Sequence, residues 1–270
     1  MTIVDSGKLP PVNWMKGGYS ALLTTARDAP LSRDWSQWLA VLRAASRGEF
    51  GTLPGLFDLA ESSESPVLVQ SCYYLLGDAG GASIGTKLAA LARTTEDFEL
   101  MIECSDALSA RGWLADVPLL LDLFLRNVDD SEAGIFSVLL DDVLKLGAED
   151  FPTPSSDVQT LSAFRAAVMA RYDVLVKQFG TADAAVFMGQ RYSVRRMAEW
   201  LFSRLQKPHF RVYWTRRFEA ATGVDCAQFY LKGAFQPLTA AAVIEEFLES
   251  PASDRFEENS RYFFGHRIPD

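Results

Sequence analysis

A helical repeat of about 32 residues between residues 53 and 146 constrains the fold of this chain more than any other feature. A shift of 32 residues superimposes Leu56, Leu59, Ala60, Leu68, Cys72, Leu76 and Gly80 on Leu88, Leu91, Ala92, Leu100, Cys104, Leu108 and Gly112. A shift of 64 residues superimposes Pro54, Leu56, Asp58, Leu59, Leu75 and Leu76 on Pro118, Leu120, Asp122, Leu123, Leu139 and Leu140. Such a period is typical of stacked helix pairs, each of which needs neighbours to bury an apolar face. The repeat predicts pairs at residues 52–60 with 66–77, 86–93 with 97–110, and 117–127 with 131–146.

Helical periodicity continues outside the repeat. Ser32 begins a predicted capping helix that stops near Gly48, after a short helix at residues 20–28. Two prolines in residues 151–156 interrupt the periodicity, so we place a domain boundary near residue 150. Beyond it we expect helices at 157–179, 182–206, 209–221 and 239–249, with strand-like alternation only at 261–268. The predicted fold is all-α, with a helix-pair domain at 1–150 and a C-terminal helical domain at 151–270.

The composition is that of an ordinary globular protein. About half of the 270 residues are apolar, which is enough for a sizeable core. No segment has the apolar length of a membrane span, and the first residues lack a signal-peptide pattern, so we expect a cytoplasmic protein. The three cysteines, Cys72, Cys104 and Cys226, lie far apart in apolar helical patterns, which is typical of reduced core thiols.

Charge is divided unevenly along the chain. Residues 1–150 carry 11 basic and 22 acidic side chains, whereas residues 151–270 carry 15 and 13. An acidic first half repels nucleic acid and attracts basic partners. The asymmetry indicates a basic ligand.

The acidic side chains of the second and third repeats form the candidate binding surface. Glu99, Glu103 and Asp106 follow one another at helical spacing, opposite the apolar positions of the same helix, and are expected to share a solvent-facing stripe. Further acids continue this surface through the third repeat: Asp129, Asp130, Glu132, Asp141 and Asp142. The alternative is a solvated face without a ligand, and a paired-carboxylate or Mg²⁺ site lacks an evident catalytic partner.

Sets of residues that could carry out catalysis are scarce. His209 and His266 have no histidine or cysteine at metal-ligand spacing, so we expect no metal, no cofactor and no enzyme activity. Residues 80–87, Gly-Gly-Ala-Ser-Ile-Gly-Thr-Lys, resemble a phosphate-binding loop. However, the final pair is reversed and a helical segment precedes the loop, so we interpret it as a turn between repeats.

The basic side chains concentrate at residues 191–217, where aromatic residues are interleaved with them. The basic members are Arg191, Arg195, Arg196, Arg204, Lys207, Arg211, Arg216 and Arg217. Single-stranded nucleic acid favours this combination, but the aromatic residues at helical spacing also fit a core, and the arginines can pair with the acidic first half. Nucleic acid is therefore the less favoured ligand.

The C-terminal segment, residues 261–269, is aromatic and basic. Its three adjacent rings, Tyr262, Phe263 and Phe264, are not expected to remain in water. We expect this segment to dock on the preceding helices or on a second copy of the chain in a homodimer.

The helix pairs of residues 53–146 resemble HEAT-like repeats, which serve adaptors, regulators and a few enzymes. With its acidic first half and the closing Arg-Tyr-Phe-Phe-Gly-His-Arg of residues 261–267, the chain resembles bacterial immunity proteins, which neutralise secreted toxins. That resemblance implies a HEAT-like solenoid that binds a protein toxin, without membrane contact and without catalysis. Two alternatives stay open: a nucleic-acid-acting HEAT-like protein of the DNA repair glycosylase type using residues 191–217, and a regulatory adaptor.

Overall fold

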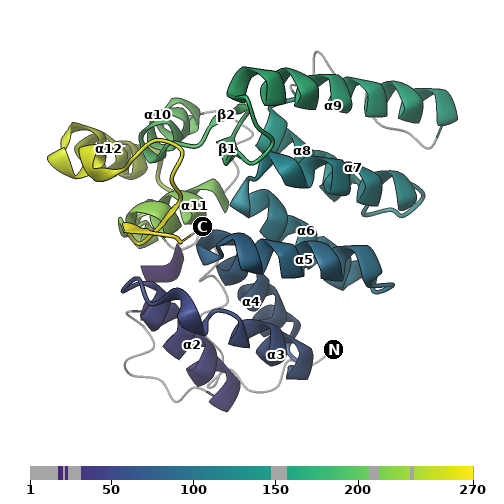
Figure 1. Ribbon diagram of the computed structural model, residues 1–270. Coiled ribbons are helices and arrows are strands. Elements are labelled where there is room, and N and C mark those ends of the chain that lie inside the picture. Colours follow the sequence, from purple (N-terminus) through teal and green to yellow (C-terminus); the bar gives the residue numbers. More distant parts are fainter. Residues whose placement is uncertain are drawn as a thin grey trace. The chain divides into compact units, whose positions relative to one another are not determined.

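The computed structural model describes residues 18–20, 22–23, 32–146, 157–206, 213–231 and 234–269 (Figure 1). These residues are mainly helical, which confirms the all-α prediction. Their contacts divide the chain into a terminal unit, residues 1–79 with 193–270, and a central unit, residues 80–192. The boundary that we predicted near residue 150 falls at residues outside the described ranges, between two helices of the central unit.

The terminal unit combines helices from both ends of the chain. Its helices are α2 (Arg33–Ala45), α3 (Gly55–Ser62), α4 (Pro66–Ala79), α10 (Val194–Arg204), α11 (Tyr213–Thr222) and α12 (Pro237–Glu249). Short 3₁₀ turns, η1 (Phe50–Thr52), η3 (Ala227–Phe229) and η4 (Pro251–Arg255), connect them, and two hairpins pair β3 (Tyr230–Leu231) with β4 (Ala234–Phe235) and β5 (Tyr262–Phe263) with β6 (His266–Arg267). Within this unit α2 packs on α3 and α4, and α11 packs on α4, α10 and β5.

The central unit consists of two successive helix pairs followed by one long helix. Its elements are α5 (Ala82–Thr94), α6 (Phe98–Arg111), η2 (Leu114–Asp116), α7 (Val117–Arg126), α8 (Gly134–Leu144), α9 (Val158–Phe179), and the hairpin of β1 (Val186–Phe187) with β2 (Gln190–Arg191). Here α6 packs on α8, α5 on α7, α9 on α7 and β1 on α8. The second and third repeats therefore contact each other through both of their helices.

The three helix pairs predicted from the repeat are confirmed as α3 with α4, α5 with α6, and α7 with α8. Cys72 in α4 and Cys104 in α6 are both fully buried, as expected for equivalent positions. Burial also raises the pKa of the Cys72 thiol to about 12, so this thiol stays protonated. The capping helix is confirmed as well, with the Ser32 side chain accepting a hydrogen bond from the Trp35 N–H at 3.4 Å.

The single helix predicted at residues 182–206 is wrong over its first half. That segment forms the β1–β2 hairpin, and α10 begins only after Ser193, whose side chain caps it. Met188 and Gly189 both have positive φ, 50° and 68°, which is the geometry of a tight two-residue hairpin turn. Residues 184–188 are apolar and all buried. A short continuous apolar run fits a buried helix as well as a buried strand, and here it forms β1 and the residues on either side of it.

A buried polar network holds the terminal unit together. Asp78, at the end of α4, accepts a hydrogen bond from the Tyr19 hydroxyl at 2.7 Å and one from Arg216 Nε at 3.1 Å. The Arg216 guanidinium also lies 3.8 Å from the centroid of the Tyr74 ring. Arg261 donates to the backbone carbonyl oxygens of Gly77 and Asp78 at 2.6 and 3.0 Å. The end of α4 is thus the point where the N-terminal, α11 and C-terminal segments of this unit meet.

A second buried carboxylate, that of Glu219 on α11, binds backbone N–H groups. It accepts hydrogen bonds from Tyr19 at 2.5 Å, Ser20 at 3.1 Å and Cys226 at 3.4 Å. Gly18 has a φ of 77°, and a side chain there would overlap this carboxylate. Burial raises the pKa of Glu219 to about 7, against the opposing effect of its hydrogen bonds.

The aromatic tail docks within its own chain. Phe263 is fully buried, and its ring packs edge-on to that of Tyr19 at 5.4 Å between centroids. Phe264 and Gly265 form the turn between β5 and β6, and their N–H groups donate to the carbonyl oxygens of Ala220 and Ala221. The strand expected at 261–268 is confirmed. We predicted that this segment docks either on the preceding helices or on a second copy of the chain, and the structure shows the first of these contacts.

Candidate functional site: an acidic edge and an arginine pocket in the central unit

Four of the eight predicted acidic residues lie exposed at one end of the helix pairs. Glu99 is in the first turn of α6, and Asp129, Asp130 and Glu132 are in or beside the loop between α7 and α8. Two more exposed acids, Glu96 and Asp97, occupy the turn between α5 and α6. We name these six residues the acidic edge.

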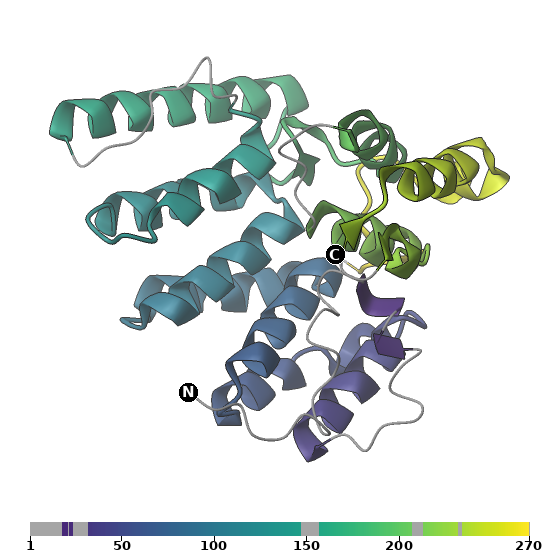
Figure 2. The same cartoon turned by 180° about the vertical axis from the view of Figure 1, so that it is seen from behind.

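Contacts between the two helix pairs bring the two halves of the acidic edge together. The Phe98 and Phe136 rings lie 6.1 Å apart, and the Asn127 side-chain amide donates to Met101 Sδ at 3.3 Å. Figures 1 and 2 show the α5–α6 turn and the α7–α8 loop at the same end of the two pairs. Residues more than 30 positions apart in the sequence therefore form one acidic surface.

Not all carboxylates of the edge are equally available. Asp97 caps α6 by accepting hydrogen bonds from the N–H groups of Glu99 and Leu100, and Asp130 accepts from the N–H of Glu132. Glu99, Asp129 and Glu132 form no ion pair with any other residue that the structure describes. These three can change partner without loss of a local hydrogen bond.

The other four predicted residues depart from the expected exposed surface. Glu103 and Asp106 are half-buried, because α6 is covered on one side by α5 and on another by α8. Asp141 is also half-buried, and its side chain accepts from the Leu146 N–H at 2.8 Å, which stabilises the end of α8. Asp142 is buried, with 2% of its surface exposed, so it cannot belong to a solvent-facing patch. The acidic stripe therefore does not extend along either helix.

A pocket of about 450 Å³ lies elsewhere in the central unit, and the sequence did not predict it. One wall is a face of α5 built from small residues, among them Ala82, Gly85 and Ala89. The segment after α6 and the end of α6 supply the rest of the lining, including Arg111, Trp113 and Asp116. Its volume lies within the range of small-molecule sites.

Backbone pairing holds the segment after α6 in place. After α6 ends at Gly112, which has a φ of 66°, residue Trp113 bridges to Ala185. Leu114 donates to the Ala184 carbonyl at 3.0 Å, and Val186 donates to the Gly112 carbonyl at 2.6 Å. The pocket residues Arg111, Trp113 and Asp183 are thereby fixed on two chain segments that support each other.

Arg111 is the most unusual side chain of the pocket, because only 5% of the side chain is exposed and not every N–H group of its guanidinium has an acceptor. It donates from Nη1 to Asp116 Oδ2 at 3.2 Å, the pair's side chains being 5% and 16% exposed. Its Nε has no hydrogen-bond partner among the described residues, and neither has Nε1 of Trp113. Burial lowers the pKa of Arg111, and the charge of Asp116 opposes this effect. A guanidinium has five N–H donors, so acceptor oxygens are missing here.

Gly85 in α5 makes room for this guanidinium. A Cβ atom at residue 85 would overlap Nη1, Cζ and Nη2 of Arg111 together, which means that the flat guanidinium group covers the glycine. Glycine inside a helix costs about 1 kcal/mol relative to alanine, so its presence needs a local reason. Contact with Arg111 supplies that reason.

We expect Gly85→Ala to destabilise the protein by roughly 1–3 kcal/mol, because Arg111 must move or α5 must shift. The matched control is Gly134→Ala at the start of α8, where a Cβ meets nothing within 4 Å. That variant should be neutral or more stable by up to about 1 kcal/mol. Urea unfolding of both variants measures the difference, and equal stability would contradict the packing of Arg111 on Gly85.

The pocket residues carried a signal in the sequence. Arg111 follows Cys104 and Leu108 at helical spacing, so a charged residue continues an apolar stripe. Gly85 interrupts the apolar face of the preceding helix of the same repeat. Asp183 could not be linked to them, because only the fold brings residues 183–186 beside residues 112–114.

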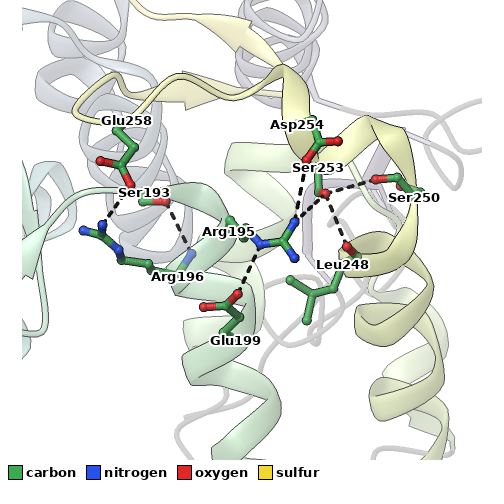
Figure 3. Close-up of polar contacts among 9 residues, drawn as sticks. All are labelled: Ser193, Arg195, Arg196, Glu199, Leu248, Ser250, Ser253, Asp254 and Glu258. Carbon is green, nitrogen blue, oxygen red and sulfur yellow. Dashed lines mark hydrogen bonds and ion pairs between the residues drawn. The ribbon is translucent and has the colours of Figure 1, made fainter.

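The basic segment of residues 191–217 is engaged in contacts within the protein. Figure 3 shows Arg195 between Glu199 of its own helix at 3.2 Å and Asp254 of η4 at 3.7 Å, with Ser253 as a further acceptor. Arg196 pairs with Glu258 at 2.8 Å (Figure 3), and Arg216 is buried against Asp78. Lys207 and Arg211 lie outside the described residues.

The aromatic residues of the same segment pack mostly on each other. The Trp200 and Trp214 rings are perpendicular at 4.4 Å between centroids, and Arg204 lies over Trp200 at 5.6 Å. Tyr213 contacts Trp214 at 5.6 Å between centroids. This is the core packing that we weighed against a stacking platform for bases.

The described residues were also searched for a phosphate-binding loop, a metal site and a membrane helix. The segment of residues 80–87, which resembles a phosphate-binding loop, contains the N-cap Gly81 and the first turn and a half of α5. The turn that we predicted between the repeats lies at the start of this segment. Among the described residues no three His, Cys, Asp or Glu side chains are grouped to hold a metal ion. Within the same ranges, no helix combines the length and hydropathy needed to cross a membrane.

The chain was compared with protein-family models, curated proteins and solved structures, and none of them matches it. The acidic edge and the arginine pocket are therefore interpreted from their own geometry and charge.

Proposed function

We propose that this chain is a non-catalytic immunity protein that binds a bacterial protein toxin in the cytoplasm and neutralises it. In this proposal the helix pairs are segments of a HEAT-like solenoid, and the acidic edge contacts a basic surface of the toxin. The neutralisation is steric, because the bound protein covers the toxin's substrate groove. A stable complex of this kind buries at least about 1,000 Å² in total.

The observation that carries the proposal is the charge of the acidic edge. Residues 94–146 contain twelve acidic and three basic side chains. Two of the three basic ones, Arg111 and Arg126, are already paired, with Asp116 and Asp122. The exposed carboxylates Glu99, Asp129 and Glu132 therefore create a local negative field, with Arg93 in the last turn of α5 as the exposed cation beside the α5–α6 turn. Such a field accelerates association with a basic partner.

A toxin that acts on nucleic acid fits this surface best. Its groove must be basic in order to hold phosphate groups, so an acidic surface can occupy the groove in their place. The internal pairing of Arg195, Arg196 and Arg216 supports a protein partner over the nucleic-acid alternative. A regulatory adaptor would use the same edge without protecting a cell.

A rescue experiment separates an immunity protein from an adaptor. The toxic domain encoded beside this chain's own gene is expressed in a bacterium with and without the chain, since immunity genes adjoin toxin genes. We expect growth only when both are present, and a stable complex of the two purified proteins. If the chain binds no neighbouring gene product and restores no growth, the immunity proposal is wrong.

The acidic edge is tested by charge reversal. We expect Glu99→Lys, Asp129→Lys and Glu132→Lys together to slow association with that toxic domain by about tenfold or more at low salt. The structural reason is that three lysines cancel the charge of the three acids that remain in the edge, Glu96, Asp97 and Asp130, while the caps formed by Asp97 and Asp130 are kept. Stopped-flow or surface-based binding at two salt concentrations measures the effect, which should shrink at high salt.

The control changes the same number of charges elsewhere. Asp58→Lys, Glu61→Lys and Glu64→Lys lie at exposed positions on and after α3, in the terminal unit. This variant has the same net charge as the first, so it reports the effect of overall charge alone. Equal rates for the two variants would remove the acidic edge from the binding surface.

A further inference from the structure

The arginine pocket of the central unit has no role in toxin binding as proposed above, yet it is built as a site. Arg111 is buried with an unpartnered Nε, and the indole Nε1 of Trp113 on the same wall is also without an acceptor in the described structure. Burying N–H donors without acceptors costs free energy, most of all for a charged group. Arg111 lines the pocket, so an occupant that brings acceptor oxygens would supply partners for its remaining guanidinium N–H groups.

The electrostatics of the pocket favour a single negative charge. Arg93 lines the pocket and forms no ion pair with other described residues, while Arg111 is shared with Asp116. Ala82 at the pocket is the first residue of α5, whose N-terminus has no side-chain cap and so presents a partial positive charge. Asp116 and Asp183 also line the pocket, and they would repel a doubly charged group such as phosphate more strongly than a singly charged one.

The shape of the pocket indicates what the negative group is attached to. Gly85 and Ala89 contribute small side chains from α5 to the lining, and the Trp113 indole contributes aromatic surface. The guanidinium of Arg111 is 5.8 Å from the Trp113 ring centroid, so charge and aromatic surface are adjacent. A planar carboxylate on a flat apolar group matches this arrangement, because guanidinium and carboxylate form parallel hydrogen bonds.

We propose that this pocket binds a carboxylate, with the Arg111 guanidinium as its anchoring cation and the Trp113 indole in contact with the group that bears it. The carboxylate can belong to a free small molecule or to an acidic side chain of a protein. In both cases the carboxylate binds the Arg111 guanidinium. The two sources differ in the group that contacts the Trp113 indole.

The test measures binding of defined probes to the full chain by calorimetry. Benzoate is expected to bind, and benzamide, which has the same shape without the charge, is expected to bind at least tenfold more weakly. Inorganic phosphate should also bind more weakly than benzoate. Equal binding of benzoate and benzamide, or no binding of benzoate at millimolar concentration, would overturn the proposal.

Two variants locate the site, and a third controls for them. Arg111→Gln should abolish benzoate binding, but it also removes the ion pair with Asp116 and can impair folding. Thr86→Leu fills the pocket from an exposed position on α5 and leaves Arg111 in place, so it should also abolish binding. Ala90→Leu is exposed on the same helix outside the pocket and should bind as the natural chain does. Retained binding in the Thr86 variant would place the probe elsewhere and contradict the proposal.

A parallel titration distinguishes the two sources. N-acetyl-glutamate N-methylamide carries the carboxylate of an acidic side chain without an aromatic ring. Tighter binding of benzoate supports a small aromatic acid, whereas tighter binding of the blocked glutamate supports an acidic side chain. Failure of both probes overturns the carboxylate site and leaves the toxin-binding proposal, which rests on the acidic edge, unaffected.

Discussion

Replacing Asp78 with alanine should destabilise the terminal unit by about 3–5 kcal/mol. Asp78 and Arg216 form a buried ion pair at 3.1 Å, with side chains only 2% and 3% exposed. Removal of the carboxylate leaves a buried positive charge without its counter-ion and deprives the Tyr19 hydroxyl of its acceptor. Urea unfolding followed by tryptophan fluorescence measures the loss.

Two further variants show that the loss comes from the buried charge. Glu257→Ala breaks an ion pair with Arg267 in the same unit, but both side chains are more than half exposed, so at most about 1 kcal/mol is expected. Arg216→Met added to Asp78→Ala removes both buried charges and should recover part of the stability. With Arg216→Met measured alone as well, a double variant whose loss of stability equals the sum of the two single losses would mean that the two side chains do not interact.

The fold class and the helix pairs could be predicted from the sequence because they depend on local spacing. Leu56, Leu88 and Leu120 occupy one register of the repeat, and all three are fully buried. Periodicity reports which face of a helix is covered, whatever covers it. The same logic failed at residues 182–193, where a continuous apolar run fitted both a buried helix and a buried strand.

Long-range pairing could not be predicted in the same way. Asp78 and Arg216 are 138 positions apart, and Arg261 reaches the Gly77 carbonyl from 184 positions away. Both contacts belong to one compact unit that is formed from the two ends of the chain. A boundary at residue 150 would assign these two ends to different domains. The spacing of residues along the sequence does not show which distant segments contact each other.

The candidate site shows the same division between local and long-range information. The exposure of Glu99 at the start of α6 and of Asp129 in the loop after α7 was predicted correctly, because helix ends and loops lie at the surface. Asp142 was misplaced, since it lies on the face of α8 that contacts other elements and its carbonyl accepts from the Met188 N–H. The charge pattern identifies acidic segments, but only the fold decides which of their members reach solvent.

The stability of the terminal unit should fall by about 3 kcal/mol between pH 4.5 and pH 7 through Glu219 alone. Its pKa is raised to about 7 in the folded protein by burial, from 4.5 for the free side chain. In this window the folded state holds a proton that the unfolded state has released. Rising pH therefore favours unfolding until the folded pKa is passed, and adds nothing further above it.

Urea unfolding of the natural chain and of Glu219→Gln from pH 5 to pH 8 measures this contribution. The neighbouring groups Tyr19 and Cys226 do not titrate in this range, because burial raises the pKa of each above its ordinary value. The stability of the natural chain should fall relative to that of the variant as pH rises. Glu49→Gln is the control: Arg47 lowers the pKa of Glu49, so its contribution is lost only in acid, below this range. A constant difference between the natural chain and Glu219→Gln from pH 5 to pH 8 would mean that Glu219 is already ionised in the folded protein. The three backbone N–H groups that donate hydrogen bonds to its carboxylate would then be what stabilises the ionised form.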